Sequence, residues 1–394
     1  MALATETTAT NTRLPSLTGL RFIAAFAVFI GHAYLTVTLN GSPVESQNWP
    51  ITFGFAGVGF FFVLSGFVLT VSARAQDTSL RFLRRRLVKI VPNHLVAWTL
   101  ALLVTLWAGA SITTGQVVPS LFLANAWFAD ILIMRGINVP SWSLSVELIF
   151  YLAFPALYLG ISRIRPERLW WWFGGFALGT LTLAVISHTA LPGQPQLPGM
   201  HMSLWQNWLV YPFPPSRLLE FALGIVTARI VLTGRWIRLG VPAATLLLAA
   251  ALVLQLLLPV TALTAVAPTA LPTALVIAAV ATADRSGRGT IFDNRVWTWL
   301  GEVSFALYIV HYPTLYFLQE SVGFGSGHSA TTSFLISLLL LLPALLVSWL
   351  LYSLVERPLV RRWSNPRPSR SDKVPAQRQG PGVAVPEAVA ETAQ

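Results

Sequence analysis

The chain has 394 residues, of which 55% are apolar and 10% charged, and its formal net charge is +11. A mean hydropathy of +0.65 and 15 Trp residues exclude an ordinary soluble domain. The chain contains no cysteine, which excludes disulfides, thiolate metal sites and a cysteine acyl-enzyme. Several stretches of about 20 residues carry almost no charge and are long enough to cross a bilayer as helices. The composition predicts an all-α, polytopic membrane protein.

Basic residues along the chain predict its orientation in the cell membrane. The apolar stretches predict ten spans, near 18–39, 51–72, 90–109, 141–161, 168–189, 218–234, 240–259, 262–283, 297–319 and 331–355. With the N-terminus inside, 24 of the 26 Lys and Arg residues fall in cytoplasmic segments, and only Arg135 and Arg217 lie outside. Because basic residues concentrate on the cytoplasmic side, both termini are predicted to be cytoplasmic. The first stretch is too long for the core of a signal peptide and no small-x-small cleavage site follows it.

The remaining segments complete the predicted organisation. Segment 110–140 is apolar but short, and counting it as a span would invert every later loop, so we predict a re-entrant or interfacial segment on the outer side. Residues 1–13 are predicted to be a cytoplasmic tail, 14–363 the membrane domain, and the Pro-rich 364–394 a disordered cytoplasmic tail. No basic domain with interleaved aromatic residues is found, so nucleic acid is not a predicted partner.

Titratable side chains are predicted inside the membrane. Arg21 and His32 lie eleven residues apart in the first span, hence on one helix face and about 16 Å apart, too far to touch. Counting along the spans places Glu147 and His311 within about 3 Å of the depth of His32. Such groups mark a functional site by default. A shared internal site is therefore favoured over separate structural hydrogen bonds between helices.

A basic cluster is predicted at the inner surface. It comprises Arg74, Arg81, Arg84, Arg85, Arg86 and Lys89. Topology anchoring or contact with anionic lipid heads explains most of them. However, Arg81 and Arg85 share a helix face, and guanidinium groups bind phosphates through paired hydrogen bonds. The cluster therefore also suits a polyanionic nucleotide such as coenzyme A. Between the two groups, Ser65 and neighbouring glycines indicate either helix packing or a narrow passage.

Several strings occur in a characteristic order across residues 14–363. They are the Arg21–His32 pair, FFVLSG, RFLRRRLVKIVP, WSLSVELIFY, RLLEFALG, LGEVSFALYIVHYP and VERP. Together they resemble the type 3 family of integral-membrane acyltransferases, which transfer acetyl and other acyl groups to carbohydrates and secondary metabolites. The opening LPSLTGLRF departs from the commoner Asp-Gly-Leu-Arg-Gly form and is more similar to the subgroup that includes macrolide O-acyltransferases.

The resemblance implies an acyl-CoA donor, a hydroxyl-bearing carbohydrate or secondary metabolite such as a macrolide as acceptor, and no bound cofactor or metal. His32 would be the general base for the acceptor hydroxyl, and Glu147 or His311 would orient it. The residues that would bind the donor are Arg21, Ser65, Arg81, Arg84 and Arg85. Those that would bind the acceptor are Trp142, Ser143 and Tyr308.

Two other classes of protein remain as alternatives. A proton-coupled secondary transporter or exporter of a sugar-like or lipid-linked substrate would also bury His and Glu in the membrane. Against it, the sequence contains neither inverted repeats nor paired broken helices. A non-catalytic assembly or sensor protein would not need Arg21, His32 and the inner basic cluster together.

Overall fold

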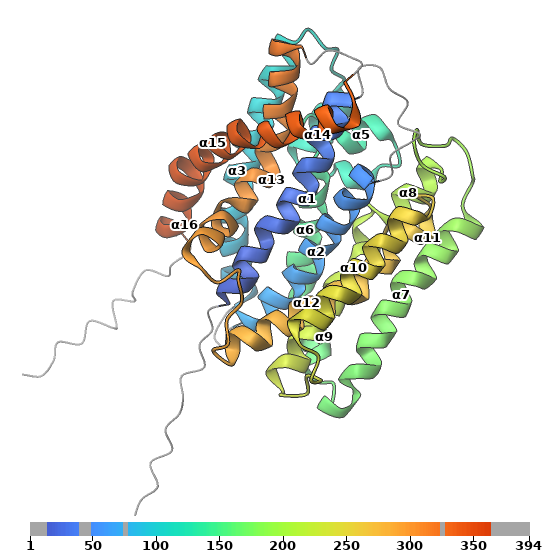
Figure 1. Ribbon diagram of the computed structural model, residues 1–394, viewed down its shortest axis with the longest axis vertical. Coiled ribbons are helices and arrows are strands. Elements are labelled where there is room, and N and C mark those ends of the chain that lie inside the picture. The colour runs from blue at the N-terminus through green and yellow to red at the C-terminus, as the bar shows by residue number, and fades with distance from the viewer. Residues whose placement is uncertain (1–13, 39–48, 74–77, 324–327, 364–394) are drawn as a thin grey trace, which may run out of the picture.

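The computed structural model describes residues 14–38, 49–73, 78–323 and 328–363, and these residues form a bundle of helices without a named strand (Figure 1). The longer helices are α1 (Pro15–Thr38), α2 (Trp49–Val71), α3 (Ser79–Trp107), α6 (Ser141–Ser162), α7 (Leu169–Ala190), α9 (Pro214–Leu232), α10 (Val241–Leu257), α12 (Ala267–Arg285) and α13 (Arg295–Val322). The predicted tails, 1–13 and 364–394, lie outside the described residues.

The last helical stretch is divided into three helices. They are α14 (Ala330–Leu339), α15 (Leu341–Leu351) and α16 (Arg357–Trp363). A π-helical turn over Tyr352–Glu356 joins α15 to α16. This turn holds one residue more than an α-helical turn, so it rotates the side chains that follow it by about 100°.

Each of the ten stretches predicted as spans lies over a helix. Among the described residues, seven helical segments are long and apolar enough to cross a bilayer. The protein is therefore a multi-pass membrane protein.

The segment 110–140 forms only short helices, α4 (Thr114–Leu121), α5 (Ile131–Arg135) and a 3-10 turn over Asn125–Trp127. Each is shorter than the roughly 20 residues that a span requires. Buried side chains attach the segment to the bundle, since the Trp98 indole N–H donates to Ser120 Oγ (2.9 Å) and Asn138 Nδ2 to the Ile309 carbonyl (2.9 Å). Helices α5, α8 (Leu204–Val210), α11 (Ala262–Ala265) and α14 gather at the upper end of the bundle (Figure 1).

Small residues and one long-range cap fix the central helices. Helix α2 crosses α9 at Gly66 and Gly224, where an added Cβ would run into the carbonyl oxygens of Phe221 and Val63. The two backbones therefore touch, as small residues in membrane helices allow. At the start of α1, the Ser16 N–H and hydroxyl donate to the two carboxylate oxygens of Asp284 on α12 (3.0 and 2.5 Å). This cap satisfies free backbone donors of α1 and fixes its position in the bundle.

Candidate active site

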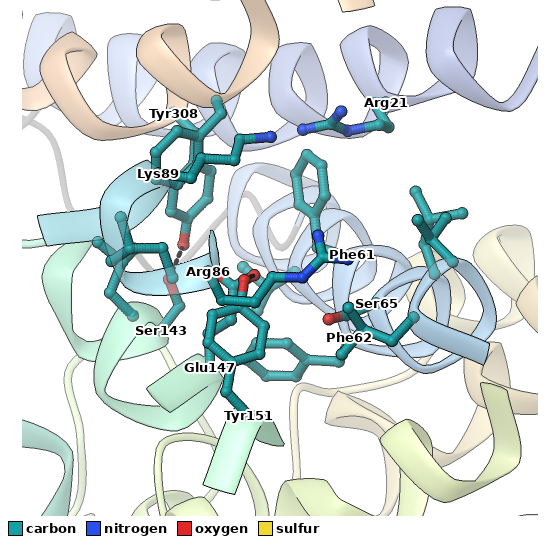
Figure 2. Close-up of a pocket in the computed structure, with 17 residues that line it drawn as sticks. Arg21, Phe61, Phe62, Ser65, Arg86, Lys89, Ser143, Glu147, Tyr151 and Tyr308 are labelled. Carbon is teal, nitrogen blue, oxygen red and sulfur yellow. Dashed lines mark hydrogen bonds between the residues drawn. The ribbon is translucent and has the colours of Figure 1, made fainter. Parts of the chain in front are cut away.

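A cavity of about 140 Å³, called here the central cavity, lies between α1, α2, α3, α6 and α13 (Figure 2). All five helices contribute polar side chains to its wall. These are Arg21, Ser65, Arg86, Lys89, Ser143, Glu147, Tyr151 and Tyr308. The remaining wall is apolar and includes Phe61 and Phe62. The cavity therefore combines an apolar channel with a few directed polar groups, which is typical of a ligand site.

The central cavity carries an excess of positive charge. Three cations line it, and the ammonium of Lys89 faces the guanidinium of Arg21 (Figure 2). The carboxylates nearby are Glu147 in the wall and Glu356 behind Lys89, whose Oε1 lies 3.9 Å from Lys89 Nζ. Arg21 makes no hydrogen bond or ion pair within the described part of the chain. Like charges held together at low dielectric repel one another, so an anion in the cavity would stabilise this arrangement.

A second cavity, of about 410 Å³, adjoins the first at Arg21 and Val68. Its other walls are the start of α1, at Leu14, and the end of α2, at Ala73. The end of α2 is also tied to α3, because Arg86 Nη2 donates to Ser72 Oγ (3.2 Å). The two cavities together lead from the start of α1 and the end of α2 into the bundle.

Two hydrogen bonds order the polar face of α6. The Tyr308 hydroxyl donates to Ser143 Oγ (2.7 Å) and the Tyr151 hydroxyl donates to Glu147 Oε1 (2.5 Å). Ser143, Glu147 and Tyr151 follow one another at intervals of four residues, which places them on one face of the helix. Their common orientation towards the cavity follows from this spacing.

His32 and His311 form a hydrogen-bonded pair. His32 Nδ1 lies 2.8 Å from His311 Nε2, and the nearly parallel rings meet edge to edge with their centroids 5.1 Å apart. His311 Nδ1 lies 3.1 Å from the Leu307 carbonyl oxygen, which can only accept, so this nitrogen carries the proton. In the neutral pair, His311 Nε2 then accepts from His32 Nδ1–H, and the lone pair of His32 is on Nε2. The pair therefore presents His32 Nε2 as a base.

The structure brings together two of the three groups predicted at one depth. His32 and His311 meet, whereas Glu147 lines the central cavity, which neither histidine lines. The physical reason is the Tyr308–Ser143 hydrogen bond, which sets the register between α13 and α6. Tyr308 precedes His311 by three residues and Glu147 follows Ser143 by four, which separates Glu147 from the histidines by about 10 Å along the bundle.

Tyr308 lies between the histidine pair and the central cavity. Its hydroxyl and ring line the cavity, and its ring centroid is 6.2 Å from that of His311 and 5.7 Å from that of Phe61. On α13, Tyr312 packs edge-on to His32 with centroids 5.8 Å apart, and its hydroxyl accepts from Arg135 Nη2 of α5 (3.0 Å). His32 thus has the short helices of segment 110–140 as neighbours.

Of the arginines predicted to bind the donor, Arg21 lines the central cavity, whereas the three on α3 do not reach it. Arg81 and Arg84 are exposed, and the Arg84 guanidinium lies 5.8 Å from the ring centroid of Trp363 on α16. Arg85 is half-buried outside the cavity wall, and Arg74 lies outside the described residues. Arg81, Arg84 and Arg85, called here the arginine rim, therefore lie at the basic end of the bundle.

Arg86 and Lys89 are the cavity cations that the predicted site omitted. The inward face of α3 could have identified them, because Phe82, Ile90, Asn93 and Ala97 are buried along it at helical spacing. Arg86 and Lys89 fall on that same face.

Trp142 also lies away from the cavity wall. Its ring packs against those of Tyr211 and Phe62, with centroids 4.6 and 6.2 Å apart. Beside them is a buried ion pair on α9, in which Arg217 Nη2 lies 2.8 Å from Glu220 Oε2 and the two side chains are 1% and 2% exposed. Arg217 also donates to the Val210 carbonyl (3.1 Å). The described residues contain no cluster of three His, Cys, Asp or Glu that could hold a metal ion.

A comparison with protein families shows which family the chain belongs to. The family model described as an acyltransferase domain matches residues 14–353. The chain belongs to this acyltransferase family. It is 37% identical over 380 residues to Acyltransferase MdmB of Streptomyces mycarofaciens, covering 94% of this chain and 97% of that protein. It is 26% identical over 326 residues to the exopolysaccharide production protein ExoZ of Rhizobium meliloti, covering 81% and 93%.

A shorter match links the acyltransferase to the peptidoglycan O-acetyltransferase OatA of Listeria monocytogenes. The two are 29% identical over 163 residues, 37% of this chain and 24% of that protein. No solved structure matches the chain. These relationships confirm the resemblance seen in the sequence and establish a membrane O-acyltransferase. They favour the enzyme over the transporter and the assembly or sensor protein that the sequence left open.

Proposed function

We propose that this acyltransferase moves an acetyl-type acyl group from acyl-CoA to a hydroxyl of a carbohydrate or of a secondary metabolite such as a macrolide. The observation that carries the proposal is the central cavity, where Arg21, Arg86 and Lys89 outnumber the nearby carboxylates. It adjoins a second cavity between the start of α1 and the end of α2. A thioester joined to a polyanionic nucleotide matches an apolar channel with a cationic entrance.

The topology supports entry of the donor from the cytoplasm. Ten spans with both termini cytoplasmic would place the arginine rim on the cytoplasmic side, where acyl-CoA is available. The phosphates would bind the rim, with Arg21, Arg86 and Lys89 deeper along the path. The pantetheine arm would pass Ser65 and carry the thioester towards Tyr308, the residue that separates the cavity from the histidine pair.

The histidine pair would perform the proton transfer. His32 Nε2 would take the proton of the acceptor hydroxyl as its oxygen attacks the thioester carbonyl. The C–S bond then breaks, and the proton passes from His32 to the departing thiolate, which gives the ester and free coenzyme A. His311 would hold the reactive tautomer of His32 through the hydrogen bond at Nδ1. Tyr308 must move, or the acyl arm must pass it, before the carbonyl reaches His32.

The acceptor would approach from the other end of the bundle. His32 lies near Tyr312 and Arg135, and α5, which carries Arg135, belongs to the segment predicted on the outer side. The relatives' names, exopolysaccharide production for ExoZ and peptidoglycan O-acetylation for OatA, support a carbohydrate hydroxyl as one class of acceptor. Glu147 then stands closer to the donor than to the base.

The test uses purified protein in nanodiscs with radiolabelled acetyl-CoA and a panel of glycan and macrolide acceptors. We expect release of coenzyme A coupled to labelling of one acceptor class. His32→Ala should lower the rate by about 10²–10⁴-fold, the usual contribution of a general base. His188→Ala, at an exposed position near the end of α7, is the matched control and should leave the rate unchanged. Unchanged acyl transfer by the His32 variant would show that another group is the base.

A further inference from the structure

Glu356 is a buried carboxylate behind the central cavity, in the VERP string that the proposed mechanism leaves without a role. Its side chain is 6% exposed, and its Oε1 lies 3.9 Å from Lys89 Nζ. Its other oxygen, Oε2, is buried and has no hydrogen-bond partner among the described residues. A buried, incompletely satisfied carboxylate is costly unless a cation stays beside it. Glu356 and Lys89 therefore depend on one another.

The π-helical turn over Tyr352–Glu356 directs Glu356 to this place. Such turns are rare and frequently occur at functional sites. Without the extra residue, an α-helical turn would rotate Glu356 by about 100° away from α3. The same turn carries Tyr352, whose hydroxyl donates to the exposed Glu302 of α13 (2.9 Å). The same π-helical turn therefore makes two contacts: a buried one from Glu356 to Lys89, and an exposed one from Tyr352 to Glu302, away from the cavity.

Lys89 needs a partner to stay in the central cavity. Its ammonium faces the guanidinium of Arg21 (Figure 2), and Arg86 lines the same wall. Both cations repel it, and its flexible four-carbon stem would allow it to turn away. The groups that oppose this are the carboxylates of Glu356 and Glu147 and the ring of Phe305, whose centroid is 5.5 Å from Nζ. Within the described part of the chain, Glu356 is the carboxylate that forms an ion pair with Lys89.

We propose that Glu356 is a positioning residue, which holds the Lys89 ammonium in the central cavity beside Arg21 and so sets the affinity for the anionic donor. The proposal rests on the proposed function, in which Lys89 contacts that donor. Glu356 itself does not line the cavity wall. Its effect should therefore pass chiefly through Lys89, its ion-pair partner.

The experiment is a double-mutant cycle in the full-length enzyme, with acetyl-CoA as the varied substrate. Glu356→Gln and Lys89→Met should each raise the KM for acetyl-CoA about tenfold and change kcat less than twofold. That factor is the loss of one charged contact. The double variant should be no worse than Lys89→Met alone, and Glu356→Asp should recover part of the affinity. Effects that simply multiply in the double variant would overturn the proposal.

Glu302→Gln and Tyr352→Phe are the matched controls, because they alter the exposed contact of the same π-helical turn. Both should leave the KM for acetyl-CoA unchanged. An increase equal to that of Glu356→Gln would show that packing of the turn matters instead of the charge on Glu356. If Lys89→Met itself has no effect on KM, the proposed donor site fails. If Lys89→Met raises KM and Glu356→Gln does not, the positioning role alone fails.

A chemical readout is independent of activity. The chain contains two lysines, Lys89 and Lys373, so mass spectrometry can follow acetylation of each by acetic anhydride in the intact protein. In Glu356→Gln, labelling of Lys89 relative to Lys373 should increase severalfold, because the released amine turns towards the entrance. An unchanged ratio, at an unchanged unfolding temperature, would contradict the role of Glu356.

Discussion

Phe62 separates two charge clusters that differ in charge balance and in the space beside them. On one side of its ring is the Arg217–Glu220 pair, with the Arg217 guanidinium 4.9 Å from the ring centroid. On the other side is the central cavity with Arg21, Arg86 and Lys89. The pair is neutral as a unit and almost fully buried, whereas the cavity is hollow and carries surplus positive charge. A balanced buried pair serves the structure, and an unbalanced cluster with space beside it can bind an anion.

The largest effect on stability should come from the balanced pair. Arg217→Met leaves Glu220 buried without a partner and should lower the free energy of unfolding by about 3–5 kcal/mol. Replacing both residues, as in Arg217→Met with Glu220→Leu, should recover most of that loss. Denaturant unfolding in detergent, followed by tryptophan fluorescence, measures both variants. The KM for acetyl-CoA of the folded fraction should stay unchanged. A tenfold increase would show that the Arg217–Glu220 pair also contributes to donor binding.

The unbalanced cluster should respond in the opposite way. Arg86→Met should raise the KM for acetyl-CoA about tenfold, or about 1.4 kcal/mol of binding. The unfolding temperature should fall little, because removing one of three mutually repelling cations offsets the loss of the hydrogen bond from Arg86 to Ser72. Steady-state kinetics and thermal unfolding of the same preparation provide the measurement. A loss of stability as large as that of Arg217→Met would show that Arg86 has a structural role and not a role in donor binding.

Phe62→Leu tests the wall between the clusters. Loss of the cation–π contact with Arg217 should lower stability by about 0.5–2 kcal/mol. The KM for acetyl-CoA should change less than twofold, because the wall stays apolar. The same two assays apply. A change in KM without a change in stability would mean that Phe62 contacts the donor directly.

The smallest effect should come from the arginine rim. Arg81 is exposed, so Arg81→Gln should raise the KM for acetyl-CoA only two- to threefold, in keeping with the small energies of exposed charges. At about 1 M salt, where the Debye length is about 3 Å, that difference should vanish. The effect of Arg86→Met should persist under the same conditions. KM values measured across a salt series would separate the rim from the cavity.

Helix geometry made much of this arrangement accessible from the sequence. A fixed rise per residue was enough to bring His32 and His311 to one depth, and they are in contact. The spacing of Ser143, Glu147 and Tyr151 likewise predicted their common face. Counting from span ends could not place Glu147, because its depth depends on how α6 slides against α13. That register is set by the hydrogen bond between Tyr308 and Ser143.

The sequence did not predict correctly which face of α3 points into the central cavity. Six basic residues within 16 positions leave several possible faces. The choice of Arg81, Arg84 and Arg85 followed the family resemblance and the spacing of the basic residues. The buried residues further along α3, among them Asn93 and Ala97, define the inward face and select Arg86 and Lys89. The partners of these cations come from distant helices. Glu356 could be assigned to Lys89 only once the π-helical turn was visible.

The crossing of α2 and α9 at Gly66 and Gly224 has a consequence for acyl-chain selection. Their backbones touch there, so α2 cannot move closer to α9 to enlarge the central cavity, and Ser65 and Phe62 form a rigid side of it. If the acyl chain of the proposed donor occupies this cavity, a longer chain would have to displace α3 and α6 on the opposite side, where the ring centroids of Phe82 and Phe154 lie 5.0 Å apart. Because the α2 side is rigid, the packing of α3 against α6 would then limit the length of the acyl chain.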